Sequence, residues 1–207
     1  MSTNARPSVV TELILGGQKS GKSRRAELLA AQWLAEVPQG GRPRRAILVA
    51  TGQAWDDEMR VRIERHQRER TERVPGMLTL EEPRDLAGVL ARESDADTLL
   101  VVDCLTLWLT NWTMPVAPES GQGFEGNQAL AHNWQAQSAH FFEALRNTPG
   151  PVVLVGNEIG LGVIPLGREV RAFVDALGVL NQRAAAACAR VTLMAAGLPL
   201  TLKDESQ

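Results

Sequence analysis

Eight residues near the N-terminus have the types and spacing needed to bind the phosphates of a nucleotide. The run Gly16-Gly17-Gln18-Lys19-Ser20-Gly21-Lys22-Ser23 fits the pattern G-x-x-x-x-G-K-[ST] at every position. In this pattern backbone N–H groups turn inward around the β- and γ-phosphates, Lys22 supplies a positive charge, and the Ser23 hydroxyl is placed to coordinate Mg²⁺. Gly-rich turns without a ligand also match such patterns. An apolar run at residues 13–15 and helix-forming residues 24–31 flank the motif, and this context favours a nucleotide site.

A carboxylate at the end of another apolar run could complete such a site. Asp103 directly follows residues 99–102, Leu-Leu-Val-Val. In proteins with a phosphate loop, an aspartate at the end of a buried strand commonly organises the magnesium ion. A strand-end aspartate can instead cap the following turn, but the phosphate loop in the same chain favours the metal role. The sequence therefore predicts Ser23 and Asp103 as the protein groups beside Mg²⁺.

A histidine lies within a strongly charged stretch of helical character. Residues 58–73 hold six arginines and four glutamates, as a solvated surface helix would. However, Met59, Ile63, His66 and Arg70 recur at spacings of four, three and four, which predicts that His66 faces the protein rather than water. A neutral imidazole there can attack the α-phosphorus of a nucleotide and release pyrophosphate. Histidines on half-buried helices are commonly structural, so spacing alone leaves both roles open.

The elements that must position these residues are those of an α/β protein. Apolar runs separated by helical stretches predict βαβ units, and continuous hydrophobicity indicates a mostly parallel sheet covered on both faces, a three-layer sandwich. The last two runs are close enough to form an antiparallel edge hairpin. The expected strands are residues 12–15, 46–50, 99–102, 152–155, 191–195 and 198–202, and the expected helices are residues 23–36, 57–73, 83–92, 128–146 and 168–190.

Several segments have more than one interpretation. Residues 51–58 and 157–165 follow strands and should lie at the same sheet edge as the phosphate loop, although the acidic residues 56–58 are expected only to stabilise a helix start. Polar residues on the helix after the second loop either position another substrate or line a subunit contact. Residues 113–127, rich in Pro, Gly, Ser and Gln, are expected to form a flexible surface loop, an insertion rather than a lid. Trp108 and Trp112 are expected in the core or an interface rather than as a stacking platform.

Composition limits the classes of protein that fit. The chain has 207 residues and a mass of 22.5 kDa, which suits a single domain spanning residues 1–207. A net charge of −2 gives no general attraction to nucleic acid. Cys104 and Cys188 are far apart and suit a reducing cytosol. No apolar run is long enough for a transmembrane segment, so the sequence predicts a soluble, cytoplasmic protein.

Taken together, these motifs resemble the bifunctional adenosylcobinamide kinase / adenosylcobinamide-phosphate guanylyltransferase family of cobalamin biosynthesis. The likeness covers nearly the whole chain. Its marks are Gly-Gly-x-x-Ser-Gly-Lys-Ser-Arg at residues 16–24, Ala-Thr at 50–51, Asp-x-Glu-Met-x-x-Arg-Ile-x-x-His at 56–66, Asn-Glu-x-Gly-x-Gly-x-x-Pro at 157–165, and a further signature at 171–183.

The resemblance implies a RecA-like P-loop fold, a homotrimer and two consecutive reactions. ATP or GTP would phosphorylate adenosylcobinamide, and GMP would then pass from GTP to that phosphate through a GMP-histidine intermediate, with Mg²⁺ as cofactor. His66 occupies the position of the family's histidine, and Lys22 would assist catalysis. The implied nucleotide contacts are Gly16, Gly17, Gln18, Lys19, Ser20, Gly21, Lys22, Ser23, Thr51, Gly52, Gln53, Gln67, Arg68, Glu69, Arg70, Glu81 and Asp103.

Three alternatives compete with this interpretation. A kinase without guanylyl transfer would be indicated by the absence of His66, which is present. A nucleotide-dependent regulatory switch is disfavoured because the chain lacks the Asn-Lys-x-Asp guanine motif of signalling GTPases. Nucleic-acid binding is disfavoured because the arginines of residues 58–73 are interspersed with glutamates.

Overall fold

The computed structural model describes residues 11–36, 42–54, 56–114 and 125–205. In this part of the chain, seven strands form one sheet in the order β3-β2-β4-β5-β1-β6-β7. Neighbouring strands are parallel except for β6 and β7, which form an antiparallel edge pair. The strands are β1 Thr11–Gly16, β2 Arg45–Ala50, β3 Leu78–Glu81, β4 Thr98–Asp103, β5 Val152–Asn157, β6 Arg190–Ala195 and β7 Leu198–Asp204.

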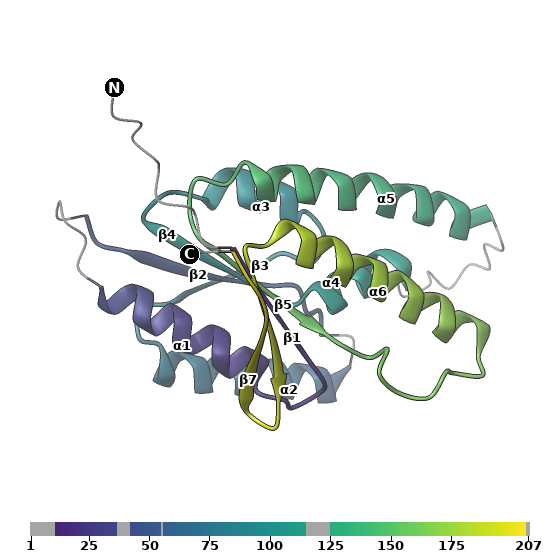
Figure 1. Cartoon of the computed structure of the whole chain (residues 1–207), viewed down its shortest axis with the longest axis horizontal. Coiled ribbons are helices and arrows are strands. Elements are labelled where there is room, and N and C mark those ends of the chain that lie inside the picture. Colours follow the sequence, from purple (N-terminus) through teal and green to yellow (C-terminus); the bar gives the residue numbers. More distant parts are fainter. Residues whose placement is uncertain (1–10, 37–41, 55, 115–124, 206–207) are drawn as a thin grey trace.

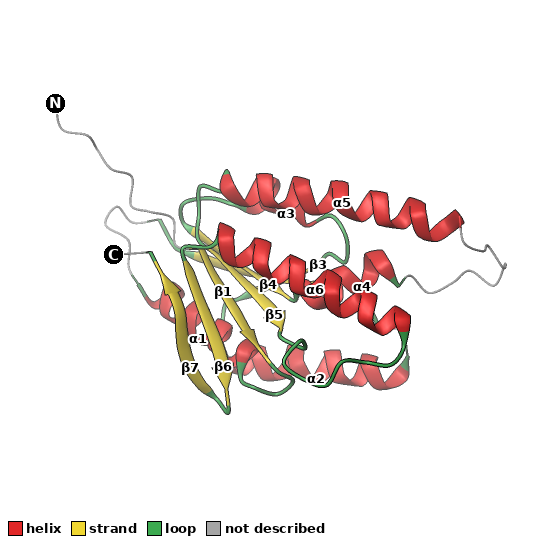
Figure 2. Ribbon diagram, turned by 45° about the vertical axis from the view of Figure 1, so that its right-hand side comes forward, coloured by secondary structure: helices red, strands yellow, loops and turns green. Residues whose placement is uncertain are grey.

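Helices cover both faces of the sheet and give three layers (Figures 1 and 2). The helices α1 and α2 lie on one face, and α3 to α6 lie on the other. Their bounds are α1 Lys22–Ala35, α2 Asp57–Arg73, α3 Leu86–Glu93, α4 Leu105–Thr113, α5 Glu125–Arg146 and α6 Arg168–Ala187. None of the helices within the described ranges is long and apolar enough to cross a membrane.

The sheet separates two hydrophobic clusters, and β4 contributes to both. Leu100 and Val102 belong to the cluster with Trp108 and the α5 residue Phe141, whereas Leu99 and Val101 belong to the cluster with α1. Successive side chains of a strand point to opposite faces, so a strand covered on both sides must be apolar throughout. This explains the continuous apolar run of β4. It also confirms the expected three-layer α/β architecture, with its mostly parallel sheet and antiparallel edge.

Two elements were not expected from the sequence, and one predicted helix starts late. The short strand β3 and the helix α4 were missed. The third predicted helix begins at Leu86 rather than at Pro83, because the Asp85 side chain accepts a hydrogen bond from the Gly88 N–H (2.9 Å) and caps the helix there. The last predicted helix ends at Ala187, and Arg190 already belongs to β6.

The loop predicted for residues 113–127 is shorter than expected. Thr113 is the last residue of α4, and residues 125–127 form the first turn of α5. Residues 115–124 lie outside the described residues. Trp108 is fully buried, as expected for a core residue, and its ring centroid lies 4.8 Å from that of Phe141.

Candidate active site

The phosphate loop connects β1 to α1 and is fixed by backbone hydrogen bonds to its neighbours. The Glu158 N–H donates to the Gly16 carbonyl (3.0 Å), and the Gly197 N–H donates to the Ser20 carbonyl (3.0 Å). Gly16 has a φ of 154°, and a Cβ there would lie 2.5 Å from the Met194 carbonyl oxygen. This position therefore requires glycine. No side chain caps the N-terminus of α1, which leaves its N–H groups available to an anion.

Lys22 is buried at the start of α1. Its Nζ donates a hydrogen bond to the Gly17 carbonyl across the loop (2.6 Å). Burial lowers the pKa of Lys22, while the nearby carboxylate of Asp103 acts in the opposite direction. A partly desolvated ammonium group beside anion-binding N–H groups suits the recognition of phosphate.

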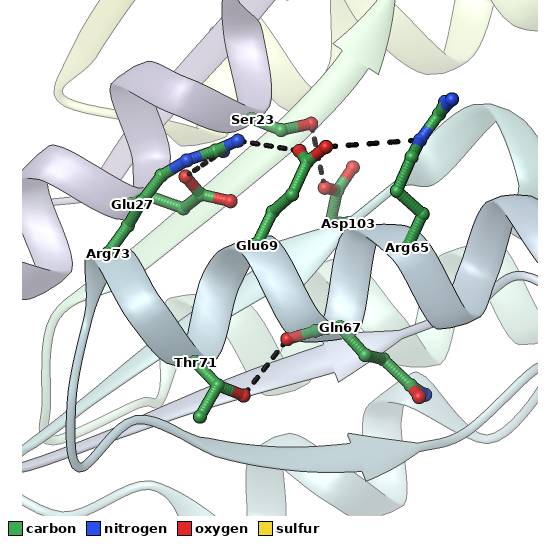
Figure 3. Close-up of polar contacts among 8 residues, drawn as sticks. All are labelled: Ser23, Glu27, Arg65, Gln67, Glu69, Thr71, Arg73 and Asp103. Carbon is green, nitrogen blue, oxygen red and sulfur yellow. Dashed lines mark hydrogen bonds and ion pairs between the residues drawn. The ribbon is translucent and has the colours of Figure 1, made fainter.

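Ser23 and Asp103 come together although 80 residues separate them. The Ser23 Oγ donates to the Asp103 Oδ2 at 2.9 Å (Figure 3). Burial raises the pKa of Asp103, and this is opposed first by the Ser23 hydrogen bond and then by Arg70, Lys22 and His66. Within the described ranges, no group of three or more His, Cys, Asp or Glu is arranged to hold a metal. Mg²⁺ fits the pair nevertheless, because it commonly takes one or two protein oxygens together with substrate phosphates.

The helix α2 is joined to the rest of the site by side chains. Asp56 caps its N-terminus by accepting from the Met59 N–H (2.6 Å). Arg70 is buried and donates to the Thr79 hydroxyl of β3 (3.2 Å). Arg73 reaches the buried Glu27 of α1 at 2.9 Å. The contact of Arg73 with Glu27 places one face of α2 toward α1, and Figure 3 shows Asp103, at the end of β4, on the same side.

Two arginines of α2, Arg65 and Arg73, contact carboxylates on this face. Glu69 contacts Arg73 at 2.6 Å and Arg65 at 3.9 Å (Figure 3). The hydrogen bond to Glu27 raises the pKa of Arg73. Burial lowers the pKa of Arg70, whereas Asp103 and Glu27 oppose that shift. The result is a mixed set of charges beside the phosphate loop, in which both Lys22 and Arg70 are buried cations.

His66 is exposed, so the prediction that it faces the protein was wrong in terms of burial. The helical stripe formed by Met59, Ile63, His66 and Arg70 is buried at Arg70 and half-buried at Met59 and Ile63. Met59 and Ile63 pack near Gly52, and Arg70 reaches β3. His66, between them, stays open to solvent. His66 is still close enough to Asp103 to help lower the pKa of that carboxyl. An accessible imidazole therefore lies on the side of α2 that faces the magnesium candidate.

The other predicted contact residues of α2 differ in what they contact. Gln67 Nε2 donates to Glu81 Oε1 at the end of β3 (3.3 Å). Gln67 and Arg68 line a cavity of about 560 Å³ with Glu64, Thr71 and Glu72. The residues that line it recur at spacings of three and four and so share one face of α2, and Arg70, three residues after Gln67, contacts the same strand β3. Arg70 is buried and close enough to Asp103 to interact with its charge, whereas Arg68 is exposed.

Thr51 is buried and joins the ends of β2 and β4. Its Oγ1 accepts from the Cys104 N–H (2.8 Å) and donates to the Cys104 carbonyl (2.7 Å). The Thr51 N–H also donates to the Asp103 carbonyl (3.1 Å). The Asp103–Cys104 peptide bond is cis. With the Thr51 hydroxyl occupied in this way, Gly52 and Gln53 are the parts of that loop left to meet a ligand.

Sequence reasoning did not identify several residues that hold the site. Glu27 and Arg73 join α1 to α2, and Asn111 of α4 donates to the Thr51 carbonyl at 2.8 Å. Asn111 had a usable signal, since it is an amide within the largely apolar stretch from Leu105 to Trp112. Burial raises the pKa of the Cys104 thiol to about 12, so this cysteine stays protonated and is no nucleophile at neutral pH.

Three features define a P-loop nucleotide-binding protein. They are the phosphate loop after β1, the Ser23–Asp103 pair, and the position of β5 between β1 and β4. Comparison with known families makes the assignment narrower. The chain belongs to the cobinamide kinase / cobinamide phosphate guanyltransferase family, whose model matches residues 12–202.

Individual relatives match this chain along almost their whole length. The bifunctional adenosylcobalamin biosynthesis protein CobP of Pseudomonas aeruginosa is 44% identical over 194 residues, covering 94% of this chain and 98% of the relative. The proteins named CobU from Escherichia coli and Salmonella typhimurium are 31% and 32% identical over 191 residues, and each match covers 92% of this chain and 98% of the relative.

Proposed function

We propose that the chain phosphorylates adenosylcobinamide and then transfers GMP from GTP to that phosphate, giving adenosylcobinamide-GDP and pyrophosphate. Both activities are those of the family to which the chain belongs. The observation that supports a shared site is the position of His66, which is solvent-accessible and lies one helical turn before Glu69, a residue on the side of α2 toward Asp103 (Figure 3). A nucleotide held by the phosphate loop would thus lie within the same region as the imidazole.

In the kinase step, the chain's contribution is to bind and orient phosphates. The N-terminus of α1 and Lys22 would hold the β- and γ-phosphates of ATP or GTP. Ser23 and Asp103 would hold Mg²⁺, which neutralises charge on the phosphate oxygens. Phosphoryl transfer depends mainly on such positioning and charge stabilisation, so no strong general base is needed.

In the second step, His66 would act as the nucleophile. A nitrogen of its neutral imidazole forms a bond to the α-phosphorus of GTP while the bond to the β-phosphate oxygen breaks and pyrophosphate leaves. An oxygen of the corrinoid phosphate then attacks the same phosphorus, and the imidazole leaves. The buried guanidinium of Arg70, on the same face of α2, would stabilise negative charge that develops at the α-phosphate.

The test uses GTP labelled at either the α- or the γ-phosphate, with Mg²⁺ and the full chain. We expect acid-labile, base-stable label from the α-position only. The His66→Ala variant should lose it by more than about 1,000-fold, since no other group replaces the nucleophile. His140→Ala, an exposed histidine on α5, is the matched control and should label like the wild type. Wild-type protein that phosphorylates the corrinoid without taking α-label would reduce the proposal to a kinase.

A homotrimer and a cytoplasmic location are part of the same proposal. The segment between β5 and α6 exposes five large apolar side chains, with exposed fractions of 42% to 96%; these are Ile159, Leu161, Val163, Ile164 and Leu166. An apolar group of this kind commonly marks an interaction surface. Sedimentation of the wild type should give a mass near three chains, and the double variant Val163→Ser, Leu166→Ser should shift it toward one chain. A wild-type mass of one chain at micromolar concentration would contradict assembly.

A further inference from the structure

One buried amide joins two loops at the edge of the site. Asn111 lies in α4 and is 1% exposed. Its Nδ2 donates to the Thr51 carbonyl, in the loop after β2, at 2.8 Å. The same nitrogen donates to the Pro83 carbonyl, in the loop after β3, at 3.0 Å. Because an amide nitrogen carries two N–H groups, both are used, one on each loop.

The contact with the loop after β3 is reciprocal. Arg84, next to Pro83, donates from Nη2 to the Asn111 carbonyl at 3.0 Å. The Trp108 indole N–H of the same helix donates to the Arg84 carbonyl at 2.8 Å. The side chains and backbone of α4 thus fix this loop at three points. Since α4 begins directly after Asp103 and Cys104, the loops are fixed relative to the end of β4.

The residues beside these attachment points are the ones expected to meet the nucleotide. Gln53 lies two residues after Thr51, and Glu81 lies two residues before Pro83. Glu81 also accepts a hydrogen bond from Gln67. The phosphate loop is held separately, through the backbone contacts of Gly16 and Ser20 with the residues after β5 and β6. Loss of the Asn111 amide would therefore alter the spacing of two contact loops while leaving the backbone contacts of the phosphate loop in place.

We propose that Asn111 is a positioning residue that sets the spacing of the loops after β2 and β3 around the GTP used in guanylyl transfer. This inference rests on the proposed function. Asn111 acts on affinity for the nucleotide rather than on bond formation, because none of its contacts is with the residues that hold phosphate or attack it. Removing uniform binding raises KM and leaves kcat unchanged.

Two variants of similar volume separate the hydrogen bonds from the packing. Asn111→Leu keeps the shape and removes both donors. Asn111→Asp has a carboxyl that faces two carbonyl oxygens in a buried place, so it takes up a proton and supplies one O–H donor. We expect the GTP concentration that half-saturates α-labelling to rise at least fivefold in Asn111→Leu and less in Asn111→Asp. The maximal labelling rate should stay within about threefold of wild type.

Equilibrium binding of a GTP analogue with a methylene group between the α- and β-phosphates gives a readout that needs no reaction. Its Kd should rise in the same order, Leu above Asp above wild type. The control is Trp33→Phe, which removes a side-chain donor to the Arg45 carbonyl (2.9 Å) at the other end of β2, and it should leave this Kd unchanged. Thermal unfolding of every variant checks folding.

Three results would contradict the inference. They are a Kd for Asn111→Leu within twofold of wild type, equal weakening in the Leu and Asp variants, or a fall in maximal rate with an unchanged half-saturating concentration. Absence of α-label in the wild type would contradict the proposed guanylyl transfer instead. The binding series would then still decide whether Asn111 sets nucleotide affinity.

Discussion

The phosphate loop and the helix α2 lie beside each other but are held in different ways. The loop is fixed by backbone hydrogen bonds to residues after β5 and β6, and one of its glycines leaves no room for a Cβ. The helix is fixed by side chains, chiefly Arg70 with Thr79 and Arg73 with Glu27. Substitutions can therefore detach α2 without changing the loop. We therefore expect the binding of phosphates and the placement of the histidine to be separable.

The largest expected effect comes from removing the charge of the loop with Lys22→Met. Both phosphoryl and guanylyl transfer should fall by at least about 100-fold, because both need a cation on the phosphates. The unfolding temperature near pH 7 should not fall, since burial lowers the pKa of Lys22 and methionine carries no buried charge. Assays of each step, with calorimetry on the same samples, test this. A loss confined to one step would show that the two reactions use different phosphate sites.

Asp103→Asn should lower phosphoryl transfer by about 100-fold and yet raise stability in nucleotide-free buffer. Burial raises the folded-state pKa of Asp103 above its unfolded value, so ionisation costs stability. That cost is absent below the unfolded pKa and reaches its full size above the folded pKa. The stability gained by the variant should thus be present near pH 7 and vanish in acid. A gain that does not change with pH would contradict this cause.

The glycine pair gives a matched test of the loop. Gly16→Ala places a Cβ 2.5 Å from a carbonyl oxygen of β6, so it should reduce the unfolding free energy by about 1–3 kcal/mol and weaken nucleotide binding. Gly17→Ala meets no atom within 4 Å and has no positive φ, so its stability should stay within about 0.5 kcal/mol of wild type. Urea unfolding measures both. Equal losses would indicate that the loop's backbone adapts.

The smallest expected effects concern α2 and separate a tethering arginine from a surface one. Arg73→Gln leaves Glu27 buried without its 2.9 Å partner, which should cost about 1–2 kcal/mol of stability and slow α-labelling more than phosphoryl transfer. Arg65→Gln removes only a 3.9 Å contact between exposed groups, worth less than about 0.5 kcal/mol. If Arg65→Gln slowed labelling as much as Arg73→Gln, the attachment of α2 to α1 would not explain the effect.

The sequence was sufficient for the parts of the fold that repeat a strong pattern. The strands β1, β2, β4, β5 and β6 are buried and were predicted from their apolar runs. β3 has only four residues and lies at the sheet edge, where Leu78 is 54% exposed, so no periodicity marks it. α4 was missed because its apolar residues follow β4 after a single cysteine, and no side chain caps its N-terminus.

The candidate site, like the fold, could be predicted from the sequence only in part. The occurrence of a phosphate loop and a strand-end aspartate in one chain predicted that Ser23 and Asp103 lie close together, and their roles at a metal stay predictions. The exposure of His66 depends on which other elements cover the middle of α2. The spacing of residues along the helix gives no information about those elements. The contacts of Thr51 and Asn111 join residues 53 and 60 positions apart, and no local pattern records such pairs.

The order of the strands has a consequence for synthesis on the ribosome. The loop at Gly16 is among the first segments made, yet it is completed by Met194 and Gly197, which contact it from the hairpin of β6 and β7. At about 5–20 residues per second, roughly ten to forty seconds pass between the appearance of the motif and that of its last neighbours. The phosphate-binding segment must wait for most of the chain, so a nascent protein stalled before β6 carries the whole motif without its finished shape.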